Sequence, residues 1–324
     1  MSQMTDPGRI REAARLLAGG GLVAFPTETV YGLGADADNP DAVRRIFAAK
    51  GRPADHPLIV HLAGPAQLGE WAREVPPEAL RLARAFWPGP LTLVLPRASR
   101  VSDLVTGGQD SVGLRVPSHP VARALLQAFG GGVAGPSANR FGRVSPTTAA
   151  HVHAELGEAV DLVLEGGPSE VGIESAIVDL SSGEPALLRP GVIGAAALAA
   201  ALGRPLGGAR TGSPRVSGAL ASHYAPATPS VLVAPGELLE RLEGAPRPAA
   251  VLARRPCPPN LSAVAWVEAP VDPLAYARHL YASLRTLDAA GAACLLVEAV
   301  PDTPEWQAVG DRLARATRPL GSRE

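Results

Sequence analysis

The sequence predicts an α/β fold made of two domains. Short apolar runs bounded by glycine or proline alternate with segments of helical periodicity along the 324 residues. At this length, one long domain or two ordinary ones are expected. A stretch rich in Gly, Pro, Ser and Arg without hydrophobic periodicity interrupts the alternation. We therefore predict a larger α/β domain at residues 1–203, a linker at 204–229 and a smaller doubly wound (Rossmann-like) α/β domain at 230–324.

Composition argues against several classes of protein. The formal net charge is −1, so no overall basic field marks a nucleic-acid binder. Cys257 and Cys294 lie far apart without a CxxC pattern, which argues against a disulfide framework or a zinc site. The N-terminal segment MSQMTDPGRI has no apolar signal region, and no run approaches the length of a transmembrane helix. We expect a soluble, cytoplasmic protein with no membrane partner.

The first domain opens with an amphipathic helix at Arg9–Leu17 that stops at three glycines. These glycines are followed by no GK[ST] and show no GxGxxG spacing, so a helix C-cap is favoured over a phosphate loop. Asn39-Pro40 supplies an N-cap and a first-turn proline for the next helix. The remaining expected elements are strands at 22–25, 58–62, 91–95, 111–116, 133–134, 162–164, 177–180 and 186–188, and helices at 68–73, 78–87, 120–129, 147–156 and 193–202.

A polar loop joins the strand at 22–25 to the helix that starts at Asn39. Within five positions it contains four side chains that can hydrogen-bond, and two glycines follow: Thr27, Glu28, Thr29 and Tyr31, then Gly32 and Gly34. Loops of this kind at strand ends are where α/β proteins bind ligands. We expect a ligand site here.

Lys50 is the only lysine of the chain, and every other basic side chain except histidine is arginine. It comes two residues before Arg52, where the second helix ends at Gly51. One interpretation is an ordinary helix C-terminus, where cations complement the dipole. The other is a phosphate site, because an ammonium is a compact point charge and a guanidinium is a flat fork. As an exposed turn cation, Lys50 is expected to contribute little to stability.

A second polar turn follows the strand at 133–134 and reads Gly135-Pro136-Ser137-Ala138-Asn139. A hydrolase nucleophile elbow requires GxSxG, and here Asn139 occupies the last position. Ser137 and Asn139, two residues apart in an extended segment, point to one side and suit hydrogen bonding of a bound group. An ordinary Asx-type turn is the structural alternative.

The second domain shows its own alternation of strands and helices. The expected strands are 231–234, 250–253, 263–267 and 294–298, and the expected helices are 237–242, 273–287 and 304–317. No glycine fingerprint follows the first of these strands, so we expect packing and regulation here and no separate nucleotide site.

Six motifs in order resemble the YrdC-type threonylcarbamoyl-AMP synthases. They are FPTETVYGLG, KGRP with PLIVH, GLRVP, PSAN, GIES and LLRPG, and they extend over about residues 8–200. The HYAP segment at 223–226 and the domain after it resemble the long, two-domain form of this family. The resemblance implies a twisted N-terminal α/β domain with a large concave pocket.

The resemblance also implies a reaction and its partners. This family joins L-threonine, bicarbonate and ATP to give L-threonylcarbamoyladenylate and pyrophosphate. A separate machinery then transfers the threonylcarbamoyl group to the adenosine beside the anticodon of ANN-reading tRNAs, so stable nucleic-acid binding by this chain is not expected. ATP is a substrate, and Mg²⁺ would be held mainly by phosphates and water, without a dedicated protein ligand.

The resemblance assigns site residues one by one. Those expected to contact ATP are Lys50, Arg52, Ser111, Asn139, Ser145, Arg189 and Tyr224. Those expected to contact threonine are Thr29, His61, Arg115, Ser137 and Ser175. Lys50 and Arg52 are the expected catalytic residues, because they would offset the charge of the phosphates and of leaving pyrophosphate.

Three of these assignments carry a further expectation. Arg115 suits the amino-acid carboxylate because its fork matches two oxygens. Tyr224 would close over the nucleotide when the linker orders. His61 would orient threonine or bicarbonate, and a buried, hydrogen-bonded strand histidine is the alternative.

The chain departs from the family pattern in two places. Ala176 stands after GIES where a hydroxyl residue is usual, so Ser175 would make that contact alone. In the linker, Val216-Ser217-Gly218-Ala219 and Ala221 replace several residues of the usual SPGM segment and the tyrosine after it. The second departure bears on how the linker reaches the pocket.

Two rival classes remain from the residues. An RNA-binding module could use arginines on a concave face, although the low aromatic content of 4% offers few stacking platforms. A carbamoyl-adenylate enzyme with another acceptor, such as the related domain of hydrogenase-maturation carbamoyltransferases, is the second rival. Those proteins carry acylphosphatase and zinc-finger segments that this sequence lacks.

Overall fold

The computed structural model describes residues 6–220, 222–259, 261, 263 and 265–317. Ala221, one of the linker residues that depart from the family pattern, lies outside the described residues. Residues 1–5, part of the N-terminal segment in which we expected no signal sequence, also lie outside them. The helices are α1 (Pro7–Ala18), α2 (Pro40–Lys50), α3 (Leu68–Trp71), α4 (Pro77–Phe86), α5 (Asp103–Thr106), α6 (Pro120–Phe129), α7 (Ala149–Leu156), α8 (Ala195–Leu202), α9 (Leu238–Glu243), α10 (Pro273–Asp288) and α11 (Gln307–Ala316).

Fourteen strands occur among these residues. They are β1 (Val23–Phe25), β2 (Gly32–Asp36), β3 (Ile59–His61), β4 (Leu91–Pro96), β5 (Ser111–Arg115), β6 (Val133–Ala134), β7 (Leu162–Val163), β8 (Ala176–Asp179), β9 (Ala186–Arg189), β10 (Gly207–Gly208), β11 (Ser230–Val233), β12 (Ala249–Ala253), β13 (Ala265–Glu268) and β14 (Cys294–Glu298). Most coincide with the predicted runs, and the α/β class is confirmed.

The chain divides into two compact units. The first contains residues up to Phe141, Pro146–Glu170 and Glu174–Ala219. The second contains the chain from Leu220 onward together with two short segments, Gly142–Ser145 and Val171–Ile173. No helix among the described residues is both long and apolar enough to cross a bilayer.

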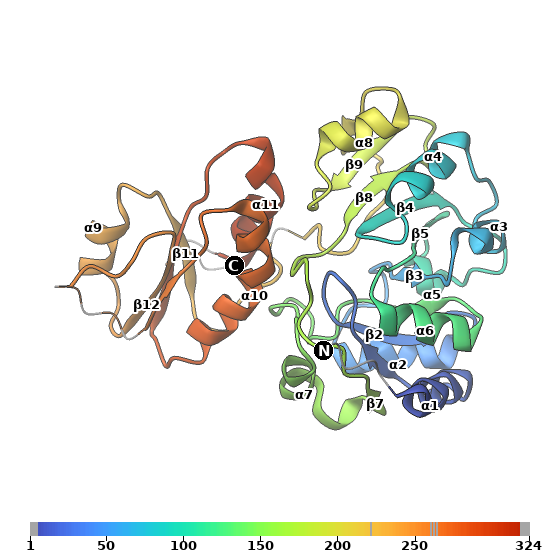
Figure 1. Ribbon diagram of the computed structural model, residues 1–324, viewed down its shortest axis with the longest axis horizontal. Coiled ribbons are helices and arrows are strands. Elements are labelled where there is room, and N and C mark those ends of the chain that lie inside the picture. Colours follow the sequence, from blue (N-terminus) through green and yellow to red (C-terminus); the bar gives the residue numbers. More distant parts are fainter. Residues whose placement is uncertain (1–5, 221, 260, 262, 264, 318–324) are drawn as a thin grey trace. The chain divides into compact units, whose positions relative to one another are not determined.

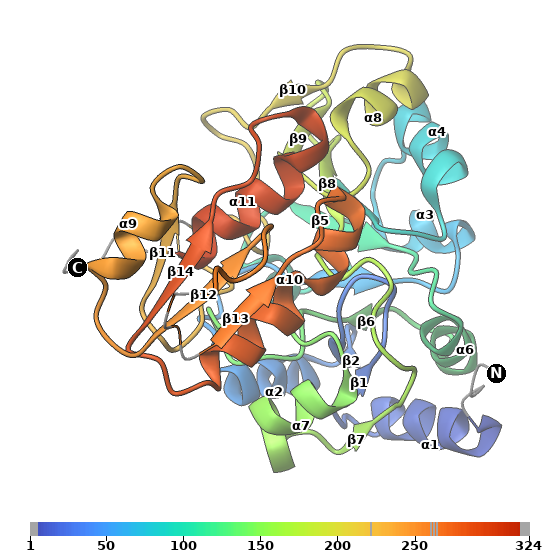
Figure 2. The same ribbon diagram turned by 60° about the vertical axis from the view of Figure 1, so that its left-hand side comes forward.

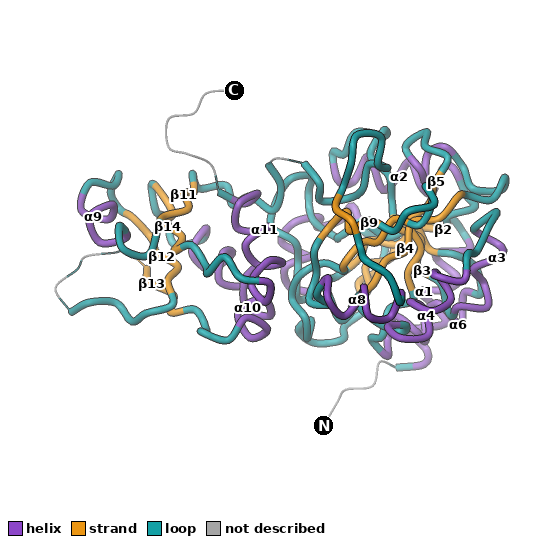
Figure 3. Tube along the Cα trace, turned by 90° about the horizontal axis from the view of Figure 1, so that it is seen from above, coloured by secondary structure: helices purple, strands orange, loops and turns teal. Residues whose placement is uncertain are grey.

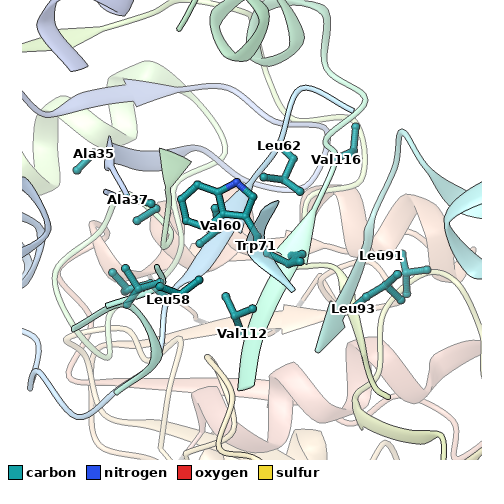
Figure 4. Packing of buried hydrophobic residues seen from close by; sticks show 14 of the residues in the cluster. Ala35, Ala37, Leu58, Val60, Leu62, Trp71, Leu91, Leu93, Val112 and Val116 are labelled. Carbon is teal, nitrogen blue, oxygen red and sulfur yellow. The ribbon is translucent and has the colours of Figure 1, made fainter. Parts of the chain in front are cut away.

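The first unit is built on a mixed sheet in the order β10-β9-β8-β4-β5-β3-β6-β2-β1-β7. Its central strands alternate strictly between two faces, as a pleated strand requires. Leu58, Val60 and Leu62 enter the main core on one face, where Figure 4 shows them around the indole of Trp71. On this face α4 packs against α8 (Figure 1). We call it the core face.

Two helices cover one end of the opposite face of the sheet. There α1 packs against α6, and both contribute to a second cluster with Phe25 and Val133 (Figure 1). His61 belongs to this face, since it is the register partner of Val133 and its ring meets Phe25 edge to face at 5.6 Å. Beyond His61, over β5, β4 and β8, this face carries polar side chains and a cavity. We call it the site face.

The sequence prediction was wrong for β2, which was expected as part of a loop. Its two glycines suggested a turn, but Gly34 serves close packing instead. A Cβ there would lie 2.9 Å from the Phe25 ring and 2.9 Å from the Val133 side chain. Glycine is therefore needed inside this strand because a neighbouring aromatic ring fills the space. The short elements α5 and β10 were also not predicted.

The second unit contains a parallel sheet in the order β11-β14-β12-β13. Figures 2 and 3 show α9 on one face of this sheet and α10 and α11 on the other. Val251 and Ala253 face α9 and pack with its Leu238 and Leu242. The smaller doubly wound domain predicted from the alternation is thus confirmed.

Candidate active site

The register of the sheet aligns three predicted site residues across the site face. His61 of β3 is paired with Arg115 of β5, and Ile177 of β8 is paired with Arg189 of β9. Thr92 of β4 lies between these pairs, as the register partner of Ile177. Directly paired residues point to the same side of a sheet, so these side chains form one row.

A small cavity of about 20 Å³ lies over the site face beside this row. Its lining comprises Pro57, Leu58, Ile59, Thr92, Val94, Gln109, Ser111, Gly113, Ile177, Arg215, Val216 and Ser217. Ser111 and Arg115 are four residues apart on β5, a distance of about 13 Å at the rise of a strand. A ligand lying along β5 could therefore contact both the cavity at Ser111 and the guanidinium at Arg115.

The altered linker segment reaches this cavity. Arg215, Val216 and Ser217 line it, and the backbone of Arg215 exchanges hydrogen bonds with the Gln109 side chain at 2.6 and 3.0 Å. The Ser217 hydroxyl donates to the Pro57 carbonyl at 2.9 Å. The departure from the SPGM pattern therefore leaves this part of the linker against the cavity.

Two predicted ATP-binding arginines meet at Ser217. The Arg52 Nη2 donates to the Ser217 hydroxyl at 3.2 Å and to the Pro57 carbonyl at 2.9 Å. Arg189 Nη1 donates to the Ser217 carbonyl at 2.8 Å. Arg189 also donates from Nε and Nη2 to the carbonyl and hydroxyl of Ser175, at 3.0 and 3.1 Å. Two permanent positive charges are thus held at one side of the cavity.

The predicted threonine end centres on Arg115, which is 4% exposed. Its Nη1 donates to the Thr29 hydroxyl at 2.9 Å, and its Nη2 forms an ion pair with Glu28 Oε1 at 2.6 Å. Thr27 fixes the loop, because its hydroxyl accepts from the backbone N–H groups of Thr29 and Val30. The polar loop predicted from sequence is therefore brought to β5.

His61 is buried and neutral at physiological pH. Burial, and next the positive charge of Arg115, lower its pKa to about 3. Its Nδ1 has no hydrogen-bond partner among the described residues. The backbone of Gly135 approaches the ring so closely that a Cβ there would lie 2.8 Å from Nδ1. The ring is therefore a buried strand histidine with one ring nitrogen left to accept a hydrogen bond, and its role in orienting threonine or bicarbonate stays a prediction.

The expectation that Lys50 is an exposed turn cation was wrong. It is the last residue of α2 and is only 3% exposed. Its ammonium donates to the backbone carbonyls of Ser137 and Asn139, and its own carbonyl accepts from the Phe141 N–H at 2.8 Å. Burial, and then the nearby charge of Arg52, lower its pKa well below the usual value for lysine. Lys50 therefore holds the PSAN turn in place.

The other predicted site residues divide between the two units. Ser175 is fully buried on the site face and shares a 2.8 Å hydrogen bond with Thr92. Ser137 is half-buried and Asn139 is buried in the turn that Lys50 holds. Ser145 and Tyr224 belong to the second unit.

Tyr224 is packed inside the second unit. Its φ of 62° is unusual for a residue other than glycine. Its ring lies 4.2 Å from that of His223 and 5.6 Å from that of Tyr281, and the Arg312 guanidinium lies 5.5 Å from its centre. The surroundings of Tyr224 are thus aromatic and cationic within its own unit.

Sequence reasoning did not assign Glu28, Thr92 or Ser217 to the site. Glu28 was noted only as one polar member of a loop. A threonine within the apolar run LTLVLP was a usable signal for Thr92, because a polar side chain on an otherwise buried strand often faces a site. No local pattern could have identified Ser217, since its role depends on where the linker packs.

Two family models match the chain. The Sua5/YciO/YrdC model, which carries the description "Telomere recombination", matches residues 15–191. The model described as "Threonylcarbamoyl-AMP synthase, C-terminal domain" matches residues 193–317. The order of the two matches is the order of the two predicted domains.

Relatives of known name match nearly the whole chain. The threonylcarbamoyl-AMP synthase of Pyrococcus abyssi is 38% identical, over 95% of this chain and 94% of the relative. That of Bacillus subtilis is 37% identical, over 96% and 94%. The crystal structure of P. abyssi Sua5 complexed with L-threonine superposes with a TM-score of 0.89 at 36% identity, covering 97% of this chain and 96% of that one.

These matches define a nucleotidyltransferase-type enzyme, and its fold is of the mixed α/β class. The chain belongs to the Sua5/YciO/YrdC family, in its long two-domain form, whose full-length relatives are threonylcarbamoyl-AMP synthases.

Proposed function

We propose that this enzyme converts L-threonine, bicarbonate and ATP into L-threonylcarbamoyladenylate, pyrophosphate and water. The observation that carries the proposal is the row on the site face, where Arg115 and His61 lie at one end and Arg189 at the other, beside a cavity. The names of the full-length relatives and the threonine complex of the P. abyssi protein support it.

The chemistry explains why the site has a threonine end and a triphosphate end on one face of the sheet. The threonine ammonium first loses a proton to solvent, and the free amine attacks the carbon of bicarbonate and, with loss of water, gives a carbamate. A carbamate oxygen then attacks the α-phosphorus and pyrophosphate leaves. Carbamates are short-lived in water, so both substrates must lie on one surface. Threonine would bind at Arg115, with His61, Thr29, Ser137 and Ser175 around it. The triphosphate would bind at the Arg52 and Arg189 side, with contacts from Ser111 and Asn139.

The guanidinium groups would act by charge. Arg52 and Arg189 offset the negative charge that develops on pyrophosphate as it leaves. Mg²⁺ would arrive with ATP, held mainly by phosphate oxygens and water. Within the described part of the chain, no cluster of three or more His, Cys, Asp or Glu side chains is arranged as a metal site.

Lys50 would act in two ways. Two of its three ammonium N–H groups hold the carbonyls of the PSAN turn, so that Ser137 and Asn139 are aimed for ligand contact. The third N–H remains for a phosphate oxygen, which is the contact expected from the sequence. The first role makes Lys50 a positioning residue even if it makes no direct contact with the nucleotide.

The product would enter tRNA modification. We propose that a separate transfer machinery accepts the adenylate and forms threonylcarbamoyladenosine in ANN-reading tRNAs, with no stable tRNA binding by this chain. We also propose that residues 1–203 form the catalytic domain, 204–229 the linker and 230–324 an accessory domain. The two compact units support the division into two parts, although they assign residues 204–219 to the first unit.

The experiment is a pyrophosphate-release assay with the full chain. It is run with ATP, labelled bicarbonate and each amino acid in turn, and the product is identified by mass spectrometry. We expect release that requires both threonine and bicarbonate, with the label in the adenylate. Release that is independent of either substrate, or that is equal for every amino acid, would contradict the proposal.

A further inference from the structure

The buried ion pair between Glu28 and Arg115 has no assigned role in the reaction. Glu28 is 4% exposed, and its Oε1 lies 2.6 Å from Arg115 Nη2. Its second oxygen, Oε2, accepts from the Ser118 N–H at 3.0 Å. Glu28 therefore sits in a fixed position, with one oxygen held by the backbone and the other against the residue expected to bind threonine.

Both members of the pair retain unused hydrogen-bonding capacity. A guanidinium has five N–H groups, and Arg115 uses three of them, toward Thr29, Glu28 and the Gly89 carbonyl at 3.4 Å. One N–H on Nη1 and one on Nη2 remain, a fork that matches a carboxylate. A carboxylate has about four acceptor positions, and the described contacts of Glu28 occupy two. The pair can thus donate to one group of a ligand and accept from another.

The charges of the pair also select the ligand. Glu28 neutralises Arg115, and neutral His61 beside it adds no positive charge. A ligand with a carboxylate alone would bring an uncompensated charge into a buried, neutral pair, which is costly. An α-amino acid zwitterion carries an ammonium and a carboxylate on the same carbon. The ammonium can contact Glu28 while the carboxylate contacts the adjacent Arg115.

We propose that Glu28 binds the ammonium group of the amino-acid substrate while Arg115 binds its carboxylate, so that this end of the site accepts α-amino acid zwitterions and rejects simple carboxylates. This inference deepens the proposed function and rests on it for the identity of the amino acid. Glu28 is then a specificity residue that touches the substrate, in addition to holding Arg115.

The test compares threonine with 3-hydroxybutyrate, which is threonine without its amino group, by isothermal titration calorimetry. In the unmodified chain we expect threonine to bind at least about 30-fold more tightly, the value of a lost charged hydrogen bond. Equal affinity for the two ligands would overturn the proposal. This arm requires no variant and so does not depend on whether a substitution folds.

The second arm uses Glu28→Gln, which keeps the shape and an acceptor for Ser118 but removes the charge. We expect threonine affinity to fall by about 10-fold or more while 3-hydroxybutyrate affinity rises, because Arg115 is no longer neutralised. A parallel loss for both ligands would mean that Glu28 only positions Arg115 and would overturn the proposal.

The result separates this inference from the proposed function. If threonine-dependent adenylate formation holds but the two affinities fall in parallel, the inference is wrong and the function stands. If another amino acid supports the reaction and shows the opposed changes against its own deaminated analogue, the inference stands and the assignment to threonine is wrong.

Discussion

Strands β3, β4 and β5 present two unlike faces built from alternate residues of the same segments. On the core face Val60, Leu93 and Leu114 are fully buried among apolar neighbours. On the site face their chain neighbours His61, Thr92 and Arg115 are also buried, yet Thr92 shares a hydrogen bond with Ser175 and Arg115 forms an ion pair with Glu28. Burial alone therefore does not distinguish the two faces. On the core face a buried side chain fills space among apolar neighbours, whereas on the site face it holds a hydrogen-bonding group in position.

This contrast predicts that substitutions on the two faces have separable effects. On the core face the free energy of unfolding should change, and activity per folded molecule should stay. On the site face activity should change by more than stability does.

Arg52→Gln should give the largest loss. Without the guanidinium, charge on the leaving pyrophosphate is less well balanced, and the rate of adenylate formation should fall by about 10³-fold. Threonine binding, measured by calorimetry, should stay within about twofold, since Arg52 lies on the nucleotide side. A rate within tenfold of the parent would contradict the role given to this residue.

Leu93→Ala tests the other face of the same sheet. It should lower the free energy of unfolding by about 3 kcal/mol through lost burial and a cavity. Denaturant unfolding measures this change, and initial rates normalised to folded protein should match the parent. If the normalised rate fell with stability, the two faces would not be independent.

Lys50→Met removes the ammonium that holds the PSAN turn. The carbonyls of Ser137 and Asn139 lose a buried partner, and activity should fall by about 10²-fold with a measurable loss of stability. Lys50→Arg should fail similarly, since a flat guanidinium does not fit between two carbonyls.

A control for the Lys50 variants is available on the same helix. Arg45→Met removes a cation that is about half exposed and paired with Asp161, and it should cost less than about 1 kcal/mol. Asn139→Ala keeps the backbone carbonyl that accepts from Lys50 but removes the side chain that this contact positions, so the activity losses in a double-mutant cycle should be strongly non-additive. If the activity losses of the two variants were additive, Lys50 would not act through the PSAN turn.

His61 links stability to pH. Its pKa of about 3 lies below the ordinary value of 6.5, so the unfolded chain binds the additional proton between these values. Stability should therefore fall as pH decreases below 6.5, and by pH 5 this residue should cost about 2 kcal/mol. When urea unfolding is measured at pH 7.5 and pH 5, the free energy of unfolding should decrease less between the two pH values for His61→Gln than for the unmodified chain.

The difference between the two proteins is the quantity to measure in that experiment. His56 and His119 also have pKa values lowered mainly by burial, so they add a decrease of the same sign to both proteins. An unchanged pH dependence in His61→Gln would show that the ring is not held neutral by its surroundings.

Ser217→Ala should have the smallest effect. The hydroxyl accepts from Arg52, one of the donors expected to bind phosphate, so its removal should lower KM for ATP by about two- to threefold. Ser213→Ala, in the same linker, is the matched control and should leave KM unchanged. A rise in KM would mean that Ser217 assists nucleotide binding instead of competing with it.

Much of the fold could be predicted because its signals are local. Asn39 caps α2 through its side chain, with Pro40 in the first turn, as the sequence indicated. The alternation in β3 and β5 likewise marks which residues share a face. The prediction failed for β2, because the fit of Gly34 against Phe25 and Val133 depends on strands brought together only by folding.

The residues assigned to the site from the sequence stay predictions, and their long-range contacts were not predicted. The motif resemblance assigned Arg115 and Lys50 to the site, and we expected the positive charge of each to contact a ligand directly. The ion pair between Glu28 and Arg115 joins residues 87 positions apart, and Lys50 reaches carbonyls 87 and 89 positions away. Contacts at this separation follow from the sheet order and leave no trace in local sequence.

The most direct test of the account is a crystal structure of the full chain with L-threonine and a non-hydrolysable ATP analogue. We predict the threonine carboxylate on Arg115 and the phosphates beside Arg52 and Arg189, with both ligands on the site face. A triphosphate bound away from those two guanidinium groups would contradict the claim that this face brings the substrates together.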